Sequence, residues 1–327
     1  MTAFKALVRR DCKLFFKDKG MFFSSLITPL ILLVLYSTFL ADIYHDSFSS
    51  ALPVAMLSVL PDDLIDGTVG SQLFSSLLAV SCVTVSFCSN LMMVQDKANG
   101  VRRDLTVSPV RGSTLALGYY VSTVLSTLLV CLVAMLACFA YLSAVGWYLN
   151  VTDILLLTLD VFLLVLFGTA LSSIVNFFLT TQGQMSAVGT IVSAGYGFLC
   201  GAYMPISQFG EGLQKVLSFM PGTYGTSLLR NHAMRGVFAE MERCGFPTEV
   251  VESIRDSVDC NLYFLADRSR PVREGTMYLI LGGMVALLIA IYVVMNLWKK
   301  KDWLRPIFRQ KISAAGRQHC PPLLNRQ

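Results

Sequence analysis

The residues best suited to specific chemistry lie in one short polar stretch, from Gln95 to Gly112, between two long apolar segments. Its acidic members are Asp96 and Asp104, and its four basic members are Lys97, Arg102, Arg103 and Arg111. Clustered cations in a short loop beside membrane spans place that loop on the cytoplasmic side. The chemistry that these side chains favour is ion pairing with a soluble surface.

Glycine and proline divide this stretch into a compact shape. Gly100 can end one helix, residues 102–105 can form a short second helix, and Pro109 can stop it. The pattern predicts a charged knuckle, residues 95–113, held between two spans and able to receive force from a soluble partner. The alternative is an exposed loop that only fixes topology.

Motifs for catalysis within the chain are missing. The sequence has no Gly-Lys dipeptide, so it lacks the phosphate-binding loop of P-loop ATPases. It also has no nucleophile elbow and no His-Glu-x-x-His motif. The nine cysteines form no Cys-x-x-Cys pair, which argues against a metal site. The three histidines, His45, His232 and His319, are scattered, and we expect them to be surface residues.

Composition identifies the elements that must hold the knuckle. Of the 327 residues, 54% are hydrophobic and 14% are charged, against about 25% charged in soluble domains. No Lys or Arg occurs between Lys19 and Lys97, or between Arg111 and Lys215. Gaps of this length admit several bilayer crossings, so we expect an all-α polytopic membrane protein.

The apolar segments predict six transmembrane helices with both termini in the cytoplasm. Residues 1–20 have basic and apolar faces at helical spacing, which predicts an interfacial amphipathic helix; a solvated tail is the alternative. The membrane domain covers residues 21–304, and the tail, 305–327, is expected to be disordered. The expected spans are 21–40, 71–94, 115–144, 154–179, 185–204 and 276–298.

An external region, residues 205–275, separates the last two expected spans. Pro205 and Pro221 bracket a semi-apolar segment too short to cross a bilayer. We expect a re-entrant helix pair there, with an ordinary outer loop as the alternative. Cys244 and Cys260 flank a predicted helix in this region; they could form a disulfide or remain free thiols.

Asp160 lies within the fourth expected span, where a carboxylate is costly unless it faces protein or water. It could line a path through the membrane. Alternatively, it lies near the outer boundary and is solvated or hydrogen-bonded.

Three motifs resemble those of type-2 ABC transporter permeases, the membrane subunits of drug, lipid and polysaccharide exporters. The segment from Gly100 to Val110 is similar to the family's coupling segment. The segment from Gly201 to Pro205 resembles its Gly-x-x-x-Pro at the end of the fifth span. Met220 to Arg230 resembles its Pro-x-x-Tyr with a following Arg. Arg102 and Arg103 depart from the family's usual Thr-Leu.

The resemblance implies roles for particular residues. ATPase coupling is expected at Gly100, Arg102, Arg103, Asp104, Leu105 and Pro109. An outer gate or re-entrant element is expected at Gly201, Pro205, Pro221 and Tyr224. Candidate path-lining residues are Phe87, Asp160 and Phe198.

The resemblance also implies partners. The chain would bind no cofactor itself; a cytoplasmic ABC ATPase subunit would carry ATP and Mg²⁺. A second permease, either a copy or a paralogue, would complete a dimer in membrane lipid, and no nucleic acid is expected. We expect a multi-pass exporter subunit of a prokaryotic plasma membrane, moving a hydrophobic or amphipathic substrate. An ion-driven secondary transporter and a polytopic membrane enzyme remain alternatives.

Overall fold

The computed structural model describes residues 2–40, 61–108, 110–264 and 271–317. Over these residues the chain is helical and forms no strand; one isolated bridge joins Tyr263 and Pro271. The elements are α1 (Thr2–Lys17), α2 (Lys19–Leu35), η1 (Tyr36–Leu40), α5 (Asp62–Ser89), α6 (Leu91–Ala98), α7 (Val101–Val107), α8 (Gly112–Val145), α9 (Val151–Phe178), α10 (Gln182–Leu199), η2 (Ile206–Gln208), α11 (Glu211–Leu217), α12 (Pro221–Arg243), α13 (Thr248–Ser257) and α14 (Glu274–Arg317).

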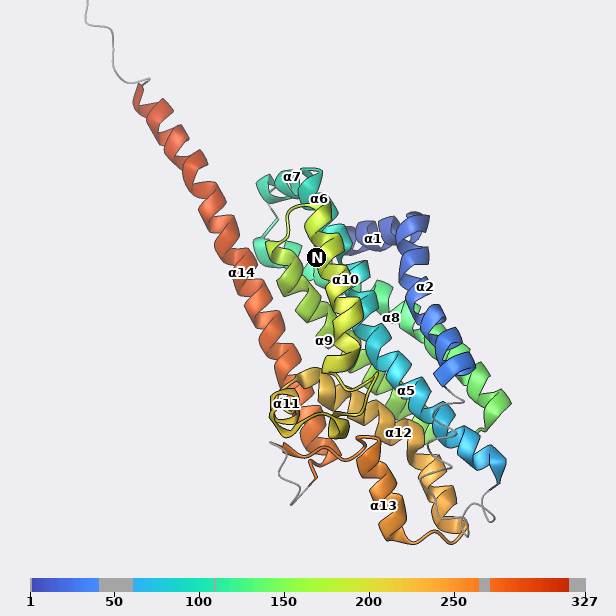
Figure 1. Cartoon of the computed structure of the whole chain (residues 1–327). Coiled ribbons are helices and arrows are strands. Elements are labelled where there is room, and N and C mark those ends of the chain that lie inside the picture. Colours follow the sequence, from blue (N-terminus) through green and yellow to red (C-terminus); the bar gives the residue numbers. More distant parts are fainter. Residues whose placement is uncertain (1, 41–60, 109, 265–270, 318–327) are drawn as a thin grey trace, which may run out of the picture.

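Five helices among the described residues are long and apolar enough to cross a membrane. They lie side by side as a tilted bundle (Figure 1), and their ranges are Lys19–Phe39, Asp63–Ala98, Gly112–Val145, Val151–Phe178 and Glu274–Trp298. The prediction of a multi-pass helical membrane protein is thereby supported. The count of six spans is not reached by length and hydropathy alone.

The expected span that is missing from these five is the fifth, residues 185–204, which corresponds to α10; this helix packs against α5 and α6 within the bundle. It has 18 residues, about 27 Å at 1.5 Å per residue. Gln182, Gln184 and several glycines lower its hydropathy below that of the five spans. The six spans expected from the apolar segments therefore exceed, by this one helix, the five found by length and hydropathy.

Helix α5 is the centre of the bundle. It packs against α2, α8, α9, α10 and α12 and is buried along most of its length. Its many hydroxyls donate to carbonyls of the preceding turn: Thr68 to Leu64 at 2.6 Å and Ser86 to Cys82 at 2.6 Å, for example. Such bonds let a polar side chain sit in an apolar interior without an unsatisfied donor.

The start of α5 corrects the sequence-based boundary of the second span. We expected this span to begin at Ser71 and placed Asp62, Asp63 and Asp66 in an outer loop. The helix in fact begins at Asp62, directly after Pro61 in an extended conformation. Carboxylates are favourable in the first turn of a helix, where unpaired backbone N–H groups lie, so charge there does not mark a loop.

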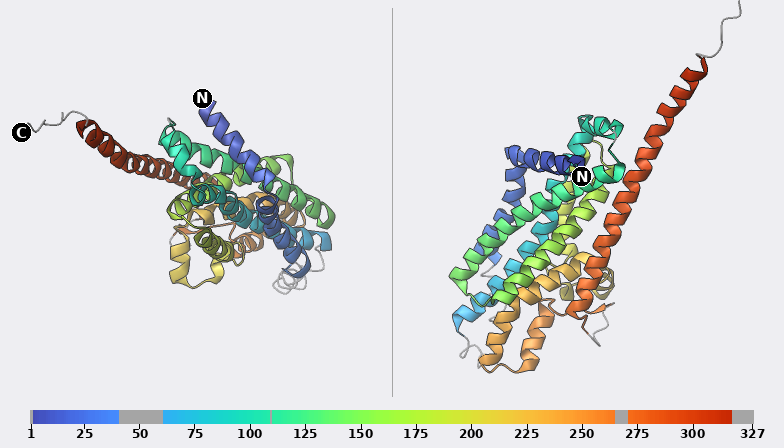
Figure 2. Two further views of the ribbon diagram at one scale, coloured as in Figure 1. Left: turned by 90° about the horizontal axis from the view of Figure 1, so that it is seen from above. Right: turned by 180° about the vertical axis from the view of Figure 1, so that it is seen from behind.

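Helix α1 runs across the ends of the spans instead of along them (Figures 1 and 2). Leu7, Asp11 and Phe15 recur every four residues and form its buried face, which packs against α8. Lys5, Arg9 and Lys13 are exposed on other faces. This arrangement agrees with the amphipathic helix expected over residues 1–20.

At the opposite end, α12 is longer than expected. The sequence suggested two short helices between prolines, but α12 has 23 residues, and Pro221 occupies its first turn. Its buried side chains contact α5, α9 and α14. Between the two prolines lie the short elements η2 and α11. The long helix α12, with its buried side chains, belongs to the core of the bundle.

Helix α14 extends past the expected end of the ordered chain. It continues to Arg317 and projects beyond the bundle on the side of α1 (Figures 1 and 2). The helix thus includes residues 305–317, part of the tail that we expected to be disordered. Charged residues after Trp298 end the apolar span, but Lys and Arg are good helix formers and do not end the helix. Residues 318–327 lie outside the described part.

Candidate functional site

The predicted knuckle is a helical hairpin made by α6 and α7. Asn90 interrupts the long second span, and α6 continues from Leu91 to Ala98. The chain then reverses at Gly100, whose φ of 79° lies in the left-handed region that favours glycine. Helix α7 follows from Val101 to Val107. We call the segment 91–107 the coupling hairpin; Pro109, expected to stop it, lies outside the described residues.

Asp96 ties the coupling hairpin to two other helices. Arg10 of α1 donates to both of its carboxylate oxygens, at 2.8 and 2.9 Å. Tyr119 of α8 donates its hydroxyl to Oδ2 at 2.6 Å. Asp96 is 5% exposed. A bidentate Arg–carboxylate pair fixes orientation as well as distance. The position of α1 is therefore coupled to that of the hairpin.

Asp11 adds a titratable group beside this pair. Its carboxylate lies 2.7 Å from Arg10, and its Oδ2 is buried without a partner in the described structure. Burial raises the pKa of Asp11 to about 6, although neighbouring Arg10 acts in the opposite direction. The junction of α1, α6 and α8 therefore changes charge near neutral pH.

Two further cations tie the coupling hairpin to α9 and α14. Lys97 donates to the carbonyls of Asn176, Phe177 and Leu179 at 2.6, 2.7 and 2.9 Å, which caps the C-terminus of α9. Arg102 donates to Oδ1 of Asn296 in α14 at 2.6 Å and lies over the Phe177 ring. The hairpin is therefore bonded to α1, α8, α9 and α14.

Five of the six expected coupling residues are described, and they divide between the inside and the tip. Arg102 faces inward, and Leu105 is half-buried against the main core. Gly100, Arg103 and Asp104 are exposed at the tip. Val107, which we did not select, is 61% exposed beside them. The tip thus combines two opposite charges with an apolar side chain.

At the other end of the bundle, a buried arginine contacts one of the expected gate residues, Gly201. Arg230 of α12 donates to the carbonyls of Gly201 and Val258 at 2.5 and 2.9 Å and to Ser76 at 3.1 Å. It also lies 3.5 Å from Asp259. Asp259 in turn accepts from the backbone N–H groups of Ile206 and Ser207. We call this set the Arg230 cluster.

Gly201, Pro205, Pro221 and Tyr224 shape the loops that the Arg230 cluster holds. Gly201 has a φ of 72°, and an added Cβ would meet Ile206 at 2.8 Å. Pro205 precedes η2, and Pro221 begins α12. The Tyr224 hydroxyl donates to the carbonyl of Ser218 at 2.6 Å. The four residues lie in the loops and helix starts of this end, and their role as a gate remains a prediction.

Asp160 is fully buried and hydrogen-bonded within the subunit. Its carboxylate lies 2.5 Å from His232 of α12 and accepts from Tyr278 of α14 at 2.5 Å. His232 is 1% exposed, so the expectation that it is a surface residue is wrong. That expectation failed because α12 continues past Arg230. The other two histidines lie outside the described residues.

The structure also places the two phenylalanines expected to line a path and the cysteine pair whose state was left open. Phe87 is 3% exposed inside the subunit and cannot line a path at its surface in this conformation; Phe198 is 50% exposed and could. Cys244 and Cys260 are free thiols. Both pack into a small apolar cluster with Met241 and Val251, where a cysteine behaves as a small hydrophobe.

Sequence comparison agrees with this arrangement. Residues 2–233, which include α1, the coupling hairpin and most of the Arg230 cluster, match the family described as ABC-2 type transporter. None of the curated proteins matches the chain. Because the match covers more than half of the sequence, this multi-pass membrane protein belongs to the ABC-2 type transporter family and is a permease subunit.

Proposed function

We propose that this chain is the permease subunit of an ATP-driven exporter, moved by a separate ATPase subunit that binds ATP and Mg²⁺. The observation that carries the proposal is the coupling hairpin, which is bonded internally to four helices and exposes a charged tip. Force applied to the tip would reach α1, α8, α9 and α14 together. Such a displacement could switch a path between inward and outward access and move a hydrophobic or amphipathic substrate.

The proposed orientation puts the α1 end in the cytoplasm of a prokaryotic cell. Exposed basic residues gather there on α1 and on the coupling hairpin, as the positive-inside rule requires. In this orientation α10 completes six spans. The segment η2–α11 would then dip into the outer leaflet beside α12.

A second permease is proposed to pack against α10. Ile191 is 70% exposed and Phe198 is 50% exposed on this helix. Gly183, Gly189 and Gly195 have open space around them. Small residues permit close helix approach in membranes, so a copy or paralogue could cover this face and enclose the path.

The test exchanges the two charges at the tip. Arg103→Glu combined with Asp104→Lys keeps the net charge but reverses the pattern that a partner surface would read. Reconstituted with its ATPase, this variant should insert and fold normally yet lose transport-coupled ATP hydrolysis. The matched control is Glu240→Lys with Arg243→Glu, an exposed pair on α12 at the opposite end. Normal coupling in the tip variant would refute the proposal.

An ion-driven carrier is the second candidate, and the Asp160 site favours it. A buried carboxylate bonded to His232 and Tyr278 has the groups of a proton relay. Transport that continued without any ATPase, and that collapsed with the proton gradient, would favour this function. Asp160→Asn should then abolish the transport that is driven by the proton gradient.

A further inference from the structure

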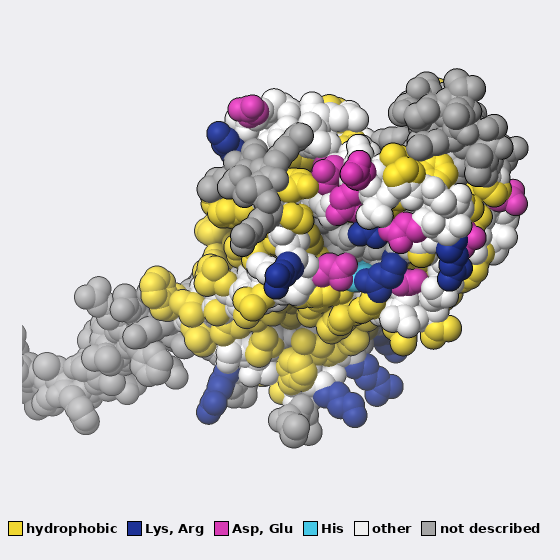
Figure 3. All heavy atoms as spheres, turned by 90° about the horizontal axis from the view of Figure 1, so that it is seen from below, with side chains coloured by type: hydrophobic (Ala, Val, Ile, Leu, Met, Phe, Trp, Pro, Cys, Tyr) yellow, Lys and Arg dark blue, Asp and Glu magenta, His cyan; other side chains and the backbone are white. Residues whose placement is uncertain are grey.

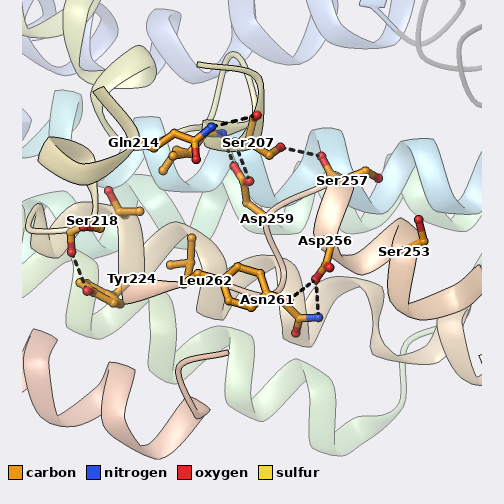
Figure 4. A pocket seen from close by; sticks show the side chains of 13 residues that line it. Ser207, Gln214, Ser218, Tyr224, Ser253, Asp256, Ser257, Asp259, Asn261 and Leu262 are labelled. Carbon is orange, nitrogen blue, oxygen red and sulfur yellow. Dashed lines mark hydrogen bonds between the residues drawn. The ribbon is translucent and has the colours of Figure 1, made fainter. Parts of the chain in front are cut away.

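A pocket of about 380 Å³ opens at the α13 end of the molecule, where both acidic and basic side chains gather on the surface (Figure 3). It lies between η2, α11, the start of α12 and the end of α13 (Figure 4). Ligand sites typically have volumes of about 300–1,000 Å³. The pocket can therefore hold a small molecule, and neither the coupling hairpin nor the proposed path uses it.

Most of the hydrogen atoms on its polar side chains are donated to the protein. The hydroxyls of Ser257, Tyr224 and Tyr263 donate to Ile254, Ser218 and Asp256. Likewise, Gln214 donates to the carbonyls of Ser207 and Phe209. What these groups leave for a ligand is mainly oxygen lone pairs, so the pocket favours a ligand rich in donors.

The charge of the lining also favours a ligand rich in hydrogen-bond donors. Among the residues that the structure describes, the carboxylates of the lining are Asp256 and Asp259, and the described lining includes no Lys or Arg. Asp259 faces the buried guanidinium of Arg230, which offsets its charge. Asp256 accepts only neutral donors, Asn261 and Tyr263, both at its Oδ1 and both at 2.9 Å. Its Oδ2 accepts no hydrogen bond from the described residues.

We propose that this pocket binds a ligand that carries a primary ammonium group next to hydroxyl groups, such as an amino sugar or an amino-alcohol headgroup. Asp256 Oδ2 would accept from the ammonium, and the remaining oxygen atoms of the lining would accept from the ligand hydroxyls. A primary ammonium fits better than a quaternary one because it supplies three N–H donors to a lining of acceptors. The rings of Tyr224 and Tyr263 add favourable surfaces for a cation.

The test compares two probes that differ in one group. Full-length protein in phosphatidylglycerol nanodiscs is titrated with glucosamine and with glucose, which has a hydroxyl in place of the ammonium. We expect glucosamine to bind at least about tenfold more tightly, since a hydrogen bond between charged groups is lost with glucose. Equal affinities for the two sugars would overturn the proposal.

Variants locate the site. Asp256→Asn keeps an oxygen for Asn261 and Tyr263 but removes the charge, and it should lower glucosamine affinity about tenfold or more. The matched control is Glu249→Gln, an exposed carboxylate on the same helix, which should bind glucosamine like the unaltered protein. Unaltered melting temperatures would show that both variants are folded. Glucosamine binding that survives in Asp256→Asn would contradict the assignment.

The lipid composition of the nanodiscs distinguishes a lipid headgroup from a soluble ligand. In nanodiscs that contain phosphatidylethanolamine, a headgroup ligand would compete and weaken glucosamine binding. A soluble ligand would leave that binding unaltered. Either result retains the ammonium assignment, and neither depends on an ATPase.

Discussion

Charged side chains tie helices together at both ends of the bundle, but the two ties differ in exposure and in what they hold. At the α1 end, Asp96 and Lys97 belong to the coupling hairpin, whose tip is exposed. Their partner on α1, Arg10 of the Asp96 pair, has a side chain that is 31% exposed. At the α13 end, Arg230 is 1% exposed and binds backbone carbonyls of neighbouring loops. The first arrangement can transmit a displacement between helices, whereas the second fixes the shape of loops.

The comparison predicts the largest loss of stability at the Arg230 cluster. Arg230→Met would leave Asp259 buried without its cation and remove hydrogen bonds from Gly201 and Ser76. We expect unfolding to become easier by about 3–5 kcal/mol, as for other broken buried pairs. Thermal unfolding in detergent, followed by tryptophan fluorescence, measures it. Arg243→Met, which removes an exposed cation from the same helix, is the control; equal shifts would show that burial of Arg230 is unimportant.

A pH-dependent gain is expected at the α1 end. The folded-state pKa of Asp11 is raised from 3.8 to about 6, so its ionised form destabilises the folded state above that pH. Below about pH 4 the carboxyl is protonated whether the chain is folded or not. Asp11→Asn should therefore stabilise the protein by about 3 kcal/mol above pH 6 and by much less near pH 4. Melting curves between pH 4 and 8 measure the difference; a gain independent of pH would contradict the charge argument.

The bidentate bond between Arg10 and Asp96 should contribute less to the free energy of unfolding than the Arg230 cluster does. Arg10 remains partly hydrated, and a charge-assisted bond of this kind contributes about 1–2 kcal/mol. A double-mutant cycle with Arg10→Ala and Asp96→Ala should give a coupling energy of that size. Additive single effects would show that the contact does not join α1 to the hairpin.

The smallest effect is expected at the cap of α9. Lys97→Met keeps the aliphatic stem but loses bonds to three carbonyls. We expect a global loss of about 1 kcal/mol or less, with faster hydrogen exchange in the last turn of α9. Unaltered exchange there would limit the role of Lys97 to topology.

Much of the fold follows from the sequence because the bilayer imposes simple rules. Apolar length gave the five spans, and the spacing of Leu7, Asp11 and Phe15 on one face of residues 2–17 agreed with an amphipathic helix. Gly100 correctly marked the turn of the coupling hairpin. These features depend on local composition, which a single chain displays directly.

The partners of buried polar residues could not be predicted in the same way. His232 and Asp160 are 72 positions apart, and Arg102 and Asn296 are 194 apart. Only the packing of helices brings such residues together. For the same reason Arg102 was grouped with the exposed tip, although it points to α14. A signal was available for Asp96, since an acid so close to an apolar segment needs a partner.

The bond between Arg10 and Asp96 also limits how the protein can be assembled. The two residues are separated by 86 positions, and Tyr119 of a later helix completes their contact. During synthesis α1 emerges well before α8, and the residues of α8 that become its neighbours are made more than a hundred residues later. The N-terminal helix must therefore wait at the membrane surface until the third span is inserted, so nascent chains that stop before α8 should leave α1 open to proteases.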